Sequence, residues 1–310
     1  MMDPNWPKKP AFQDLRRLLR GRLVKDRSLK KYTTYRVGGP ADLYFEPLDR
    51  DDLAALMRYV HEREIPFFVI GKGANLLVSD KGFRGVVVNL RKGLKELNIR
   101  DLAVTAGSGA VLWDFLYEMQ RNSLGGLEKL IGIPGTIGGA IYMNAGAFGS
   151  EISDCLVSVD VMKHNGEVVT LNKEQIPFGY RKGFTEPDKI TLGIALRMKG
   201  SDSAVLRSTM DEIWRRRKST QPLSFPSAGS VFKRPPGKYA GVLIEQAGLK
   251  GTRVGGAVVS TKHANFILNK NNATAQNIYD LIKMIRDRVH RRFGVTLELE
   301  NQLVGWDNVE

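Results

Sequence analysis

The segment GIPGTIGGAIYMNAGAFG, residues 132–149, contains six glycines among its eighteen residues. Glycine loses more conformational freedom on folding than any other residue, so this density is costly unless the backbone must approach something closely. A flat, extended cofactor lying against the main chain would require such an approach. The segment therefore predicts an irregular cofactor-binding loop, with too many glycines for a regular helix.

A second glycine loop, IGKGANLLV, occupies residues 70–78. Gly71 and Gly73 closely follow an apolar run that is typical of a buried strand, so bare backbone could turn sharply there and point N–H groups at an anion. The loop has Leu76 where the dinucleotide fingerprint has its third glycine, and it lacks the Gly-Lys-Ser/Thr of a P-loop. By itself this pattern fits a tight turn as well as a diphosphate site.

The surrounding chain alternates helical and extended patterns. Apolar residues at helical spacing predict helices over residues 11–22, 51–62, 110–122, 204–218 and 275–292. Thr274 could cap the start of the last helix, and Gly294 could end it. The runs of apolar and β-branched residues predict strands within residues 85–90 and 152–198. The second range also contains an Asn-Gly pair, which is typical of a hairpin turn. Residues 295–306 predict a strand with leucines on one face and glutamates on the other.

Length and composition indicate a globular protein. A chain of 310 residues with 42% hydrophobic content can hold two or three domain cores. Its single cysteine, Cys155, excludes an internal disulfide, and we expect a buried structural thiol in a reducing compartment. No apolar run approaches the ~20 residues that cross a bilayer, and residues 1–10 lack the apolar core of a secretory signal. We therefore expect a cytoplasmic protein without membrane insertion.

The positive charge is unevenly distributed. Of a net charge of +14, residues 1–31 supply +7, from ten Lys/Arg and three Asp. A basic segment can bind nucleic acid, but the chain has no zinc-ligand spacing, no RNP-type aromatic motif and no convincing helix-turn-helix. A solvated basic segment therefore explains the charge as well. The remaining excess suits small anionic ligands, because phosphate groups favour basic clefts.

Eight motifs, in order, resemble one enzyme family. They are TTYRVGGPAD (33–42), GKGANLLVSDKGFRG (71–85), GLEKLIGIPGTIGGAIYMNAGAFG (126–149), FGYR (178–181), PSAGSVFKRP (226–235), AGVLIEQAGLKG (240–251), HANFILN (263–269) and LELENQLVG (297–305). Their order is similar to that of the UDP-N-acetylenolpyruvoylglucosamine reductases (MurB) of bacterial peptidoglycan precursor synthesis. The resemblance runs from Tyr32 to Gly305.

The resemblance implies an α+β fold with a two-part FAD-binding module of the vanillyl-alcohol-oxidase/PCMH type and a C-terminal α+β substrate-binding domain. Residues 1–31 would form a basic N-terminal extension with a short helix. The expected divisions are 32–95 for the first FAD-binding subdomain, 96–200 for the second and 201–300 for the substrate domain. Residues 301–310 would pack on the first subdomain.

The implied reaction uses non-covalent FAD. NADPH reduces the flavin, which then reduces UDP-N-acetylglucosamine enolpyruvate to UDP-N-acetylmuramate. The enzyme would bind no nucleic acid and act as a monomer or a weak homo-oligomer. By the same resemblance, the cofactor-binding residues come from the two glycine loops: Gly71, Lys72, Gly73, Ala74, Asn75, Leu76, Gly132, Ile133, Pro134, Gly135, Gly138, Gly139, Ala140 and Asn144.

Three polar residues match the family's catalytic positions. Arg181 would stabilise the negative charge that develops on the substrate carboxylate as hydride adds, which lowers the barrier. Ser230 would deliver a proton to the adjacent carbon, a role that needs no neighbouring histidine. Glu300 would polarise the substrate, with Glu298 as a rival. The family usually has an apolar residue after this glutamate, whereas this chain has Asn301.

The chain resembles the shorter type of the family. The longer type has a tyrosine-bearing loop between the GYR and serine motifs, and only about fifty residues separate Arg181 from Ser230. The sugar nucleotide would then be bound by other groups. The candidates are Tyr180, Arg217, Lys218, Lys233 and Arg234.

Two alternatives remain at this stage. A flavin oxidase of the same cofactor fold would often attach FAD through His or Cys; Cys155 and the four histidines lie outside the motifs where attachment is expected, but His61 and His164 stay open. A nucleic-acid-binding protein would explain the basic N-terminal residues and would carry no flavin.

Overall fold

The computed structural model describes residue 6 and residues 9–186 and 188–306. Contacts divide the chain into two compact units. Unit 1 contains the residues up to Asp26, Asp42–Gly71 and Gly85–Arg215; unit 2 contains Arg27–Ala41, Lys72–Arg84 and the residues from Arg216 onward. The division into two FAD-binding subdomains and a substrate domain stays a prediction. Of the basic extension, residues 1–5 and 7–8 lie outside the described residues.

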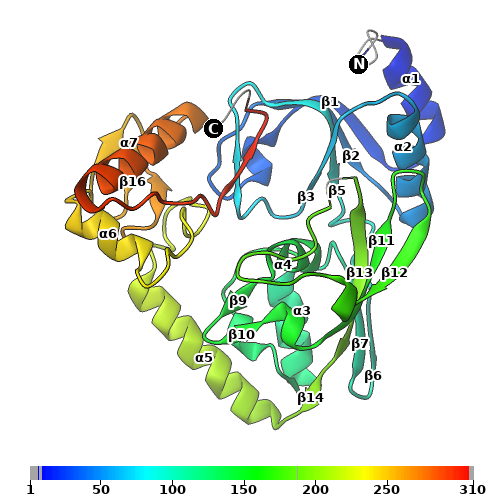
Figure 1. Ribbon diagram of the computed structural model, residues 1–310. Helices are drawn as coiled ribbons and strands as arrows, with labels where there is room; N and C mark the ends of the chain where they lie inside the picture. Colours follow the sequence, from blue (N-terminus) through cyan, green and yellow to red (C-terminus); the bar gives the residue numbers. More distant parts are fainter. Residues whose placement is uncertain (1–5, 7–8, 187, 307–310) are drawn as a thin grey trace. The chain divides into compact units, whose positions relative to one another are not determined.

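The first layer of unit 1 combines two helices with a four-stranded sheet (Figure 1). The helices are α1 (Lys9–Leu18) and α2 (Arg50–Glu62), and the sheet order is β1 (Arg22–Ser28), β2 (Pro40–Glu46), β5 (Phe83–Asn89) and β3 (Phe67–Ile70). Strands β3 and β5 run parallel. Leu15 of α1, Leu53 and Leu56 of α2 and Val88 of β5 share one buried core. The expected helix over 51–62 is confirmed.

Helix α1 ends four residues earlier than the predicted helix over 11–22. The main-chain N–H groups of Arg20 and Gly21 donate to the Asp52 carboxylate at 2.9 and 2.8 Å. A Cβ on Gly21 would lie 2.2 Å from the Glu46 carbonyl, so the chain must pass close to β2 here. These contacts turn the chain out of the helix and into β1.

A second sheet forms the other layer of unit 1. Its antiparallel order is β12 (Val168–Asn172), β11 (Leu156–Met162), β13 (Ile190–Arg197), β7 (Ala103–Gly107) and β6 (Leu97–Arg100). Helices α3 (Leu112–Arg121) and α4 (Ile137–Met143) belong to the same core. The shorter elements are β8 (Leu124–Gly125), β9 (Gly146–Ala147), β10 (Ser150–Glu151), β14 (Lys199–Gly200) and the 3-10 turns η2 (Glu128–Leu130), η3 (Ile152–Asp154) and η4 (Lys173–Gln175).

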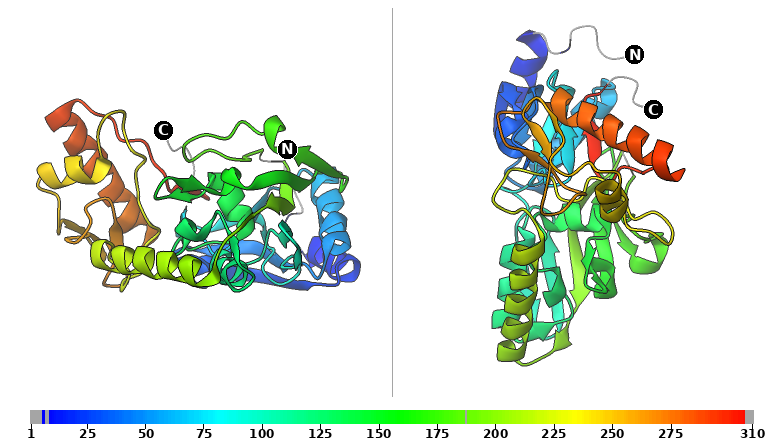
Figure 2. Two further views of the ribbon diagram at one scale, coloured as in Figure 1. Left: turned by 90° about the horizontal axis from the view of Figure 1, so that it is seen from below. Right: turned by 90° about the vertical axis from the view of Figure 1, so that its left-hand side faces the viewer.

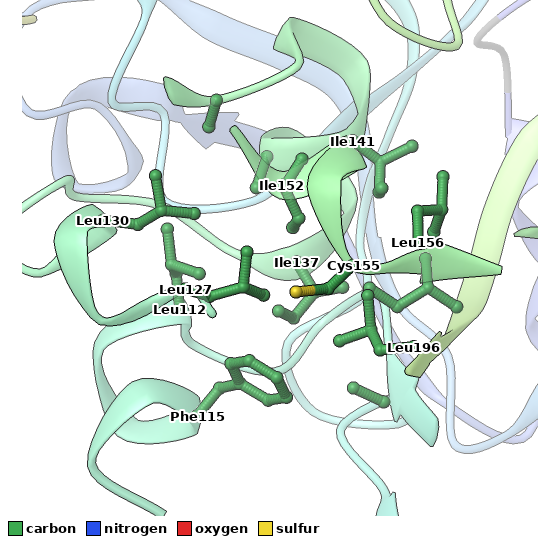
Figure 3. Packing of buried hydrophobic residues seen from close by; sticks show 14 of the residues in the cluster. Leu112, Phe115, Leu127, Leu130, Ile137, Ile141, Ile152, Cys155, Leu156 and Leu196 are labelled. Atoms are coloured by element: carbon green, nitrogen blue, oxygen red, sulfur yellow. The ribbon is translucent and has the colours of Figure 1, made fainter. Parts of the chain in front are cut away.

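Cys155 is buried in this core, as expected from its isolation in the sequence. Its sulfur points among apolar side chains that include Leu127, Ile137 and Leu196 (Figure 3). Burial raises the pKa of the Cys155 thiol, because an apolar surrounding disfavours the thiolate.

The glycine-rich segment contains a short helix, so the expectation of an entirely irregular loop is wrong. Thr136 caps α4 with a side chain that accepts a hydrogen bond from the Gly139 N–H. A Cβ on Gly138 would lie 3.0 Å from the Ser108 Cβ. Glycine is therefore used for close packing inside a helix, and the cap offsets part of its low helix propensity.

Unit 2 is built from a three-stranded sheet and two helices. The sheet order is β15 (Arg253–Val254), β16 (Ala257–Val259) and β17 (Ile267–Asn269), and the helices are α6 (Ala240–Gln246) and α7 (Ala275–Phe293). Helix α7, orange to red in Figure 2, packs against β15, β16 and α6. Its predicted caps are confirmed: Thr274 accepts from the Asn277 N–H, and Gly294 has φ 66°.

Two further connections complete the chain. The predicted helix over 204–218 is confirmed as α5 (Ser203–Thr220), within which the sequence passes from unit 1 to unit 2. The 3-10 turn η1 (Leu29–Tyr32) belongs to unit 2, as does the parallel pair of β4 (Leu76–Val78) and β18 (Gln302–Val304). In the part of the chain that the structure describes, no helix has the length and apolarity that a membrane span requires.

The strand predicted over 295–306 is mostly irregular. Only β18 is a regular strand, and Leu299 makes an isolated bridge to Phe232. The expected alternation holds only at its start, with Leu297 buried and Glu298 exposed, since Leu299 and Glu300 are both half-buried. The segment is interrupted because it pairs first with residues 231–233 and then with β4.

Candidate active site

Gly71, at the start of one predicted glycine loop, lies close to the other loop within unit 1. A Cβ placed on Gly71 would lie 2.5 Å from the Thr136 Oγ1, at the start of α4. Gly135 has φ 158°, and a Cβ there would meet no protein atom within 4 Å. Close backbone approach therefore explains Gly71, whereas Gly135 adjoins open space that a bound group could fill.

Ser108 lies beside this junction and was missed by the sequence analysis. Its Oγ is buried and has no hydrogen-bond partner among the described residues, while its carbonyl accepts from the Gly138 N–H at 2.8 Å. An unsatisfied buried hydroxyl costs about 1–3 kcal/mol. A polar cofactor bound at the glycine loops would supply the missing partner. The Gly-Ser-Gly sequence after β7 could have indicated Ser108.

The predicted cofactor residues Lys72–Leu76 belong to unit 2, and the other nine belong to unit 1. Gly73 has φ 59°, and a Cβ there would lie 2.2 Å from the Tyr32 carbonyl oxygen. Its own carbonyl accepts from the Thr34 N–H at 3.1 Å. Glycine is thus required at position 73 by the protein's own backbone.

Asn144 ends α4 in the left-handed conformation with a fully buried side chain. Its Nδ2 donates to Glu151 Oε2 at 2.6 Å and to the Gly179 carbonyl at 3.2 Å, and its Oδ1 accepts from the Ser153 N–H. The side chain of this predicted cofactor residue is therefore engaged within the protein. It connects the glycine-rich segment to the turn that carries Arg181.

Arg181 occupies a two-residue hairpin turn. Gly179 and Lys182 exchange two main-chain hydrogen bonds, which leaves Tyr180 and Arg181 at the tip. Arg181 has φ 56°, and its guanidinium donates to the Gly146 carbonyl at 3.1 Å. A left-handed backbone conformation is strained at a non-glycine residue, and such residues are found preferentially at functional sites. The side chain of Tyr180 is exposed beside it.

In unit 2, the segments of Ser230 and Glu300 lie side by side. The Glu300 N–H donates to the Val231 carbonyl at 2.8 Å, and Phe232 forms a bridge with Leu299. Asn301, next to Glu300, donates from Nδ2 to the Ser230 carbonyl at 3.2 Å. The structure thus brings two of the three predicted catalytic residues together within one unit.

Glu298, the rival to Glu300, has a different environment. Its carboxylate forms an ion pair with the Lys233 Nζ, and its carbonyl accepts from the Lys233 N–H at 2.9 Å. The Glu298 side chain is 72% exposed. Glu298 and Lys233, two residues proposed from sequence, therefore pair with each other at the surface.

The remaining cationic candidates fall into two groups in unit 2. Lys218 lines a cavity of about 400 Å³ together with Phe225, Ser260, Lys262 and Lys270. Lys262 donates from Nζ to the Lys218 carbonyl, and the Lys270 Nζ lies 4.6 Å from the centre of the Phe225 ring. Sequence analysis missed Lys262 and Lys270 because they lie far from Lys218 in the chain.

The second group consists of Arg234 and Arg217, which do not line this cavity. The Arg234 guanidinium lies 4.3 Å from the centre of the exposed Tyr239 ring, at the start of α6. Arg217, in the last turn of α5, is 8% exposed. In the described part of the chain, no cluster of His, Cys, Asp and Glu could hold a metal ion.

Comparisons with known proteins assign these features to a family. Residues 41–172 match the FAD binding domain, and residues 221–304 match the C-terminal domain of UDP-N-acetylenolpyruvoylglucosamine reductase. The reductase of that name from Caldanaerobacter subterraneus is 43% identical over 93% of this chain and 95% of its own. The chain belongs to the UDP-N-acetylenolpyruvoylglucosamine reductase family. It is an FAD-dependent oxidoreductase with a mixed α and β fold.

Further relatives agree with this family membership. The UDP-N-acetylenolpyruvoylglucosamine reductase of Clostridioides difficile is 43% identical over 91% of this chain and 93% of its own. The crystal structure of the MurB enzyme from Thermus caldophilus superimposes with a TM-score of 0.79 at 38% identity, covering 92% of this chain and 99% of that one. Both glycine loops fall inside the FAD-domain match, and Ser230 and Glu300 fall inside the MurB C-terminal match.

Proposed function

We propose that this MurB-family enzyme uses NADPH, through non-covalent FAD, to reduce UDP-N-acetylglucosamine enolpyruvate to UDP-N-acetylmuramate. The observation that carries the proposal is the pairing of the Ser230 and Glu300 segments inside the part of the chain that matches the family's C-terminal domain. Bound FAD supplies the hydride-transfer chemistry, and the residues named at the two glycine loops and Ser108 would hold it. The remaining chemistry belongs to the protein's own residues.

Arg181 is proposed to stabilise charge. Hydride addition to an enol ether conjugated to a carboxylate moves negative charge onto that carboxylate, so a fixed cation beside it favours the transition state over the ground state. The tight turn and the contact with the Gly146 carbonyl support a fixed guanidinium. A fixed cation needs little reorganisation when the charge develops.

Ser230 is proposed to deliver the proton that completes the reduction. The acceptor carbon becomes strongly basic once charge develops, so a hydroxyl held at short distance is a sufficient acid. Glu300 is proposed to hydrogen-bond the substrate next to it. Glu300 is favoured over Glu298 for this role because its N–H donates to the carbonyl of Val231, next to Ser230, whereas the Glu298 side chain is 72% exposed.

The sugar nucleotide is proposed to bind through cationic groups of unit 2 together with Tyr180. The cavity lined by Lys218, Lys262 and Lys270 suits an anionic group, since three lysines contribute to its lining. Arg217 and Arg234 are further candidates. Lys233, also a candidate, forms an ion pair with Glu298. We further propose that the enzyme is cytoplasmic and is a monomer or a weak homo-oligomer.

A visible spectrum tests the proposal. The purified holoenzyme should show flavin absorbance that bleaches on anaerobic addition of NADPH and returns on addition of the enolpyruvyl sugar nucleotide. Bleaching that the sugar nucleotide fails to reverse would contradict the proposed substrate. Flavin colour that stays on the chain after denaturation would instead indicate covalent attachment, for which His61 and His164 are the candidates. Protein that binds no flavin but binds nucleic acid in a salt-dependent way would favour the remaining alternative.

A further inference from the structure

Asn301 is the centre of a buried polar network in unit 2. The residue is 3% exposed, and its Oδ1 accepts from the Tyr35 hydroxyl at 3.0 Å. Its Nδ2 lies 2.8 Å from Asn75 Oδ1, 3.1 Å from the Ala228 carbonyl and 3.2 Å from the Ser230 carbonyl. One side chain therefore contacts three chain segments that are far apart in the sequence.

Asn75 extends the network to Glu300. Its Nδ2 donates to the Glu300 carbonyl at 2.8 Å, and its own carbonyl accepts from the Gln302 N–H at 2.9 Å. The Glu300 N–H in turn donates to the Val231 carbonyl. The main chain at Glu300 is thus bonded directly to Val231, the residue after Ser230, and is linked to Ser230 through two asparagine side chains.

Two main-chain carbonyls fix the orientation of the Asn301 amide. The Ala228 and Ser230 carbonyls can only accept, so Nδ2 must face them. Oδ1 then faces the fully buried Tyr35 side chain, whose hydroxyl donates to it. Asn269 anchors the other side of this residue by donating to the Tyr35 carbonyl at 2.9 Å.

A buried amide of this kind favours one arrangement of the chain. Burying a polar group is costly unless its hydrogen bonds are made, and here both ends of the Asn301 amide have partners. A fully satisfied buried network rigidifies its surroundings. An apolar side chain at position 301 would withdraw the shared partner of Tyr35, Asn75 and Ser230. The network thus couples the geometry of the Ser230 segment to the residue after Glu300.

We propose that Asn301 is a positioning residue that sets the main-chain geometry of Ser230 and Glu300, and so the efficiency of proton delivery to the substrate. The proposal rests on the proposed roles of Ser230 and Glu300. Asn301 acts only through its neighbours: Ser230 remains the group that loses the proton. A displacement of about 1 Å in a reacting group can cost about 100-fold in rate, so loss of one anchoring side chain is enough to matter.

The test compares Asn301→Val with the unaltered holoenzyme in the two half-reactions. Flavin reduction by NADPH should stay within about twofold, because it needs no proton from Ser230. Reoxidation by the enolpyruvyl sugar nucleotide should fall by about 10-fold in its maximal rate, with little change in the substrate concentration at half-saturation. The solvent deuterium isotope effect on reoxidation should increase as proton transfer becomes more rate-limiting.

Amide hydrogen exchange supplies a readout that is independent of turnover. The Glu300 and Gln302 N–H groups should exchange about 10-fold faster in Asn301→Val, since their hydrogen-bonded segments lose an anchor. Ile285→Val, in the core face of α7, is the matched control: it should lower the melting temperature by about 2–4 °C while leaving both half-reactions unchanged. Equal losses of reoxidation in the two variants would overturn the proposal.

Two further results keep the test decisive. If Asn301→Val does not fold, Tyr35→Phe removes one hydroxyl from the same network and should give smaller changes in the same direction; no change in either reoxidation or exchange would overturn the proposal. Ser230→Ala distinguishes a failure of the proposed proton donor from a failure of the proposed role of Asn301. Normal turnover by that variant would contradict the proposed proton donor, whereas the exchange of Glu300 and Gln302 would still decide whether Asn301 holds these segments.

Discussion

At the scale of single residues, the candidate catalytic side chains stand out in the sequence, whereas the residues that contact their segments do not. Ser230, Arg181 and Glu300 stand inside recognisable motifs. Ser108 and Lys262 were missed, because neither residue type stands out without its spatial neighbours. The role of Asn301 was likewise invisible, since its contacts join positions 35, 75, 228 and 230. Sequence spacing carries no information on such long-range contacts.

Ser230→Ala separates proton delivery from electron entry. The variant should still be bleached by NADPH, because flavin reduction does not use the hydroxyl. Reoxidation by the sugar nucleotide should slow by at least about 100-fold, which is the usual scale of a general-acid contribution. Stopped-flow absorbance of the two half-reactions measures this directly. Unimpaired reoxidation would assign the proton to another group.

At the scale of secondary structure, periodicity located the helices, and local contacts decided where they end. The helices α2, α5 and α7 follow the predicted ranges, since each carries a clear apolar face. Helix α4 was missed because its glycine content argues against a helix. Its Thr136 cap is local, but the packing of Gly138 on Ser108, which explains the glycine, joins positions far apart in the sequence. The C-terminal strand was predicted too long, because alternation of leucine and glutamate cannot reveal that the segment changes partners.

The cap of α2 gives a pH-dependent prediction. The Asp49 carboxylate accepts from the Asp52 N–H, and this bond, followed by the Arg20 side chain, lowers the pKa of Asp49 from its ordinary 3.8. A lowered folded-state pKa stabilises the protein above the ordinary value, and this stabilisation is lost as pH falls below about 3.8. In Asp49→Asn, which keeps a capping side chain, unfolding below this pH should depend less on pH. Denaturant unfolding between pH 6 and pH 2.5 measures it, and an unchanged pH dependence would contradict the assignment.

Gly73→Ala tests the close approach in the second glycine loop. Gly73 and Gly237 both have positive φ, at 59° and 65°, so alanine strains the backbone at either position. Only at Gly73 would the Cβ meet backbone, at 2.2 Å from the Tyr32 carbonyl. We expect Gly237→Ala to cost about 1 kcal/mol and Gly73→Ala several times more. Thermal unfolding of the two variants measures the difference, and equal costs would show that close packing is unimportant at Gly73.

At the scale of the whole molecule, family membership was predictable because eight motifs occur in order, and the relatives confirm it. The FAD-binding and MurB C-terminal matches also agree with the predicted α+β class. The grouping of residues 27–41 and 72–84 with the C-terminal part was not predicted. It depends on pairing between segments such as β4 and β18, which are more than 200 positions apart.

The net charge of +14 leads to a prediction for the whole enzyme. Attraction of an anionic substrate by a positively charged protein weakens as salt shortens the Debye length from about 10 Å at 0.1 M to about 3 Å at 1 M. The kcat/KM for the sugar nucleotide should therefore fall several-fold over this range, mostly through KM. Steady-state kinetics at constant pH measures this, with melting temperature as the control. A salt-independent kcat/KM would mean that overall charge does not assist substrate capture.

The burial of the only cysteine has a practical consequence. Cys155 can react with a water-soluble thiol reagent only when the core of unit 1 opens, so its labelling rate at neutral pH reports the frequency of that opening. The native cysteine of the folded enzyme should therefore react very slowly with thiol reagents. A cysteine introduced at an exposed position could carry a fluorophore or spin label without removal of the native residue. Distances and motions during turnover could then be followed in an otherwise unaltered chain.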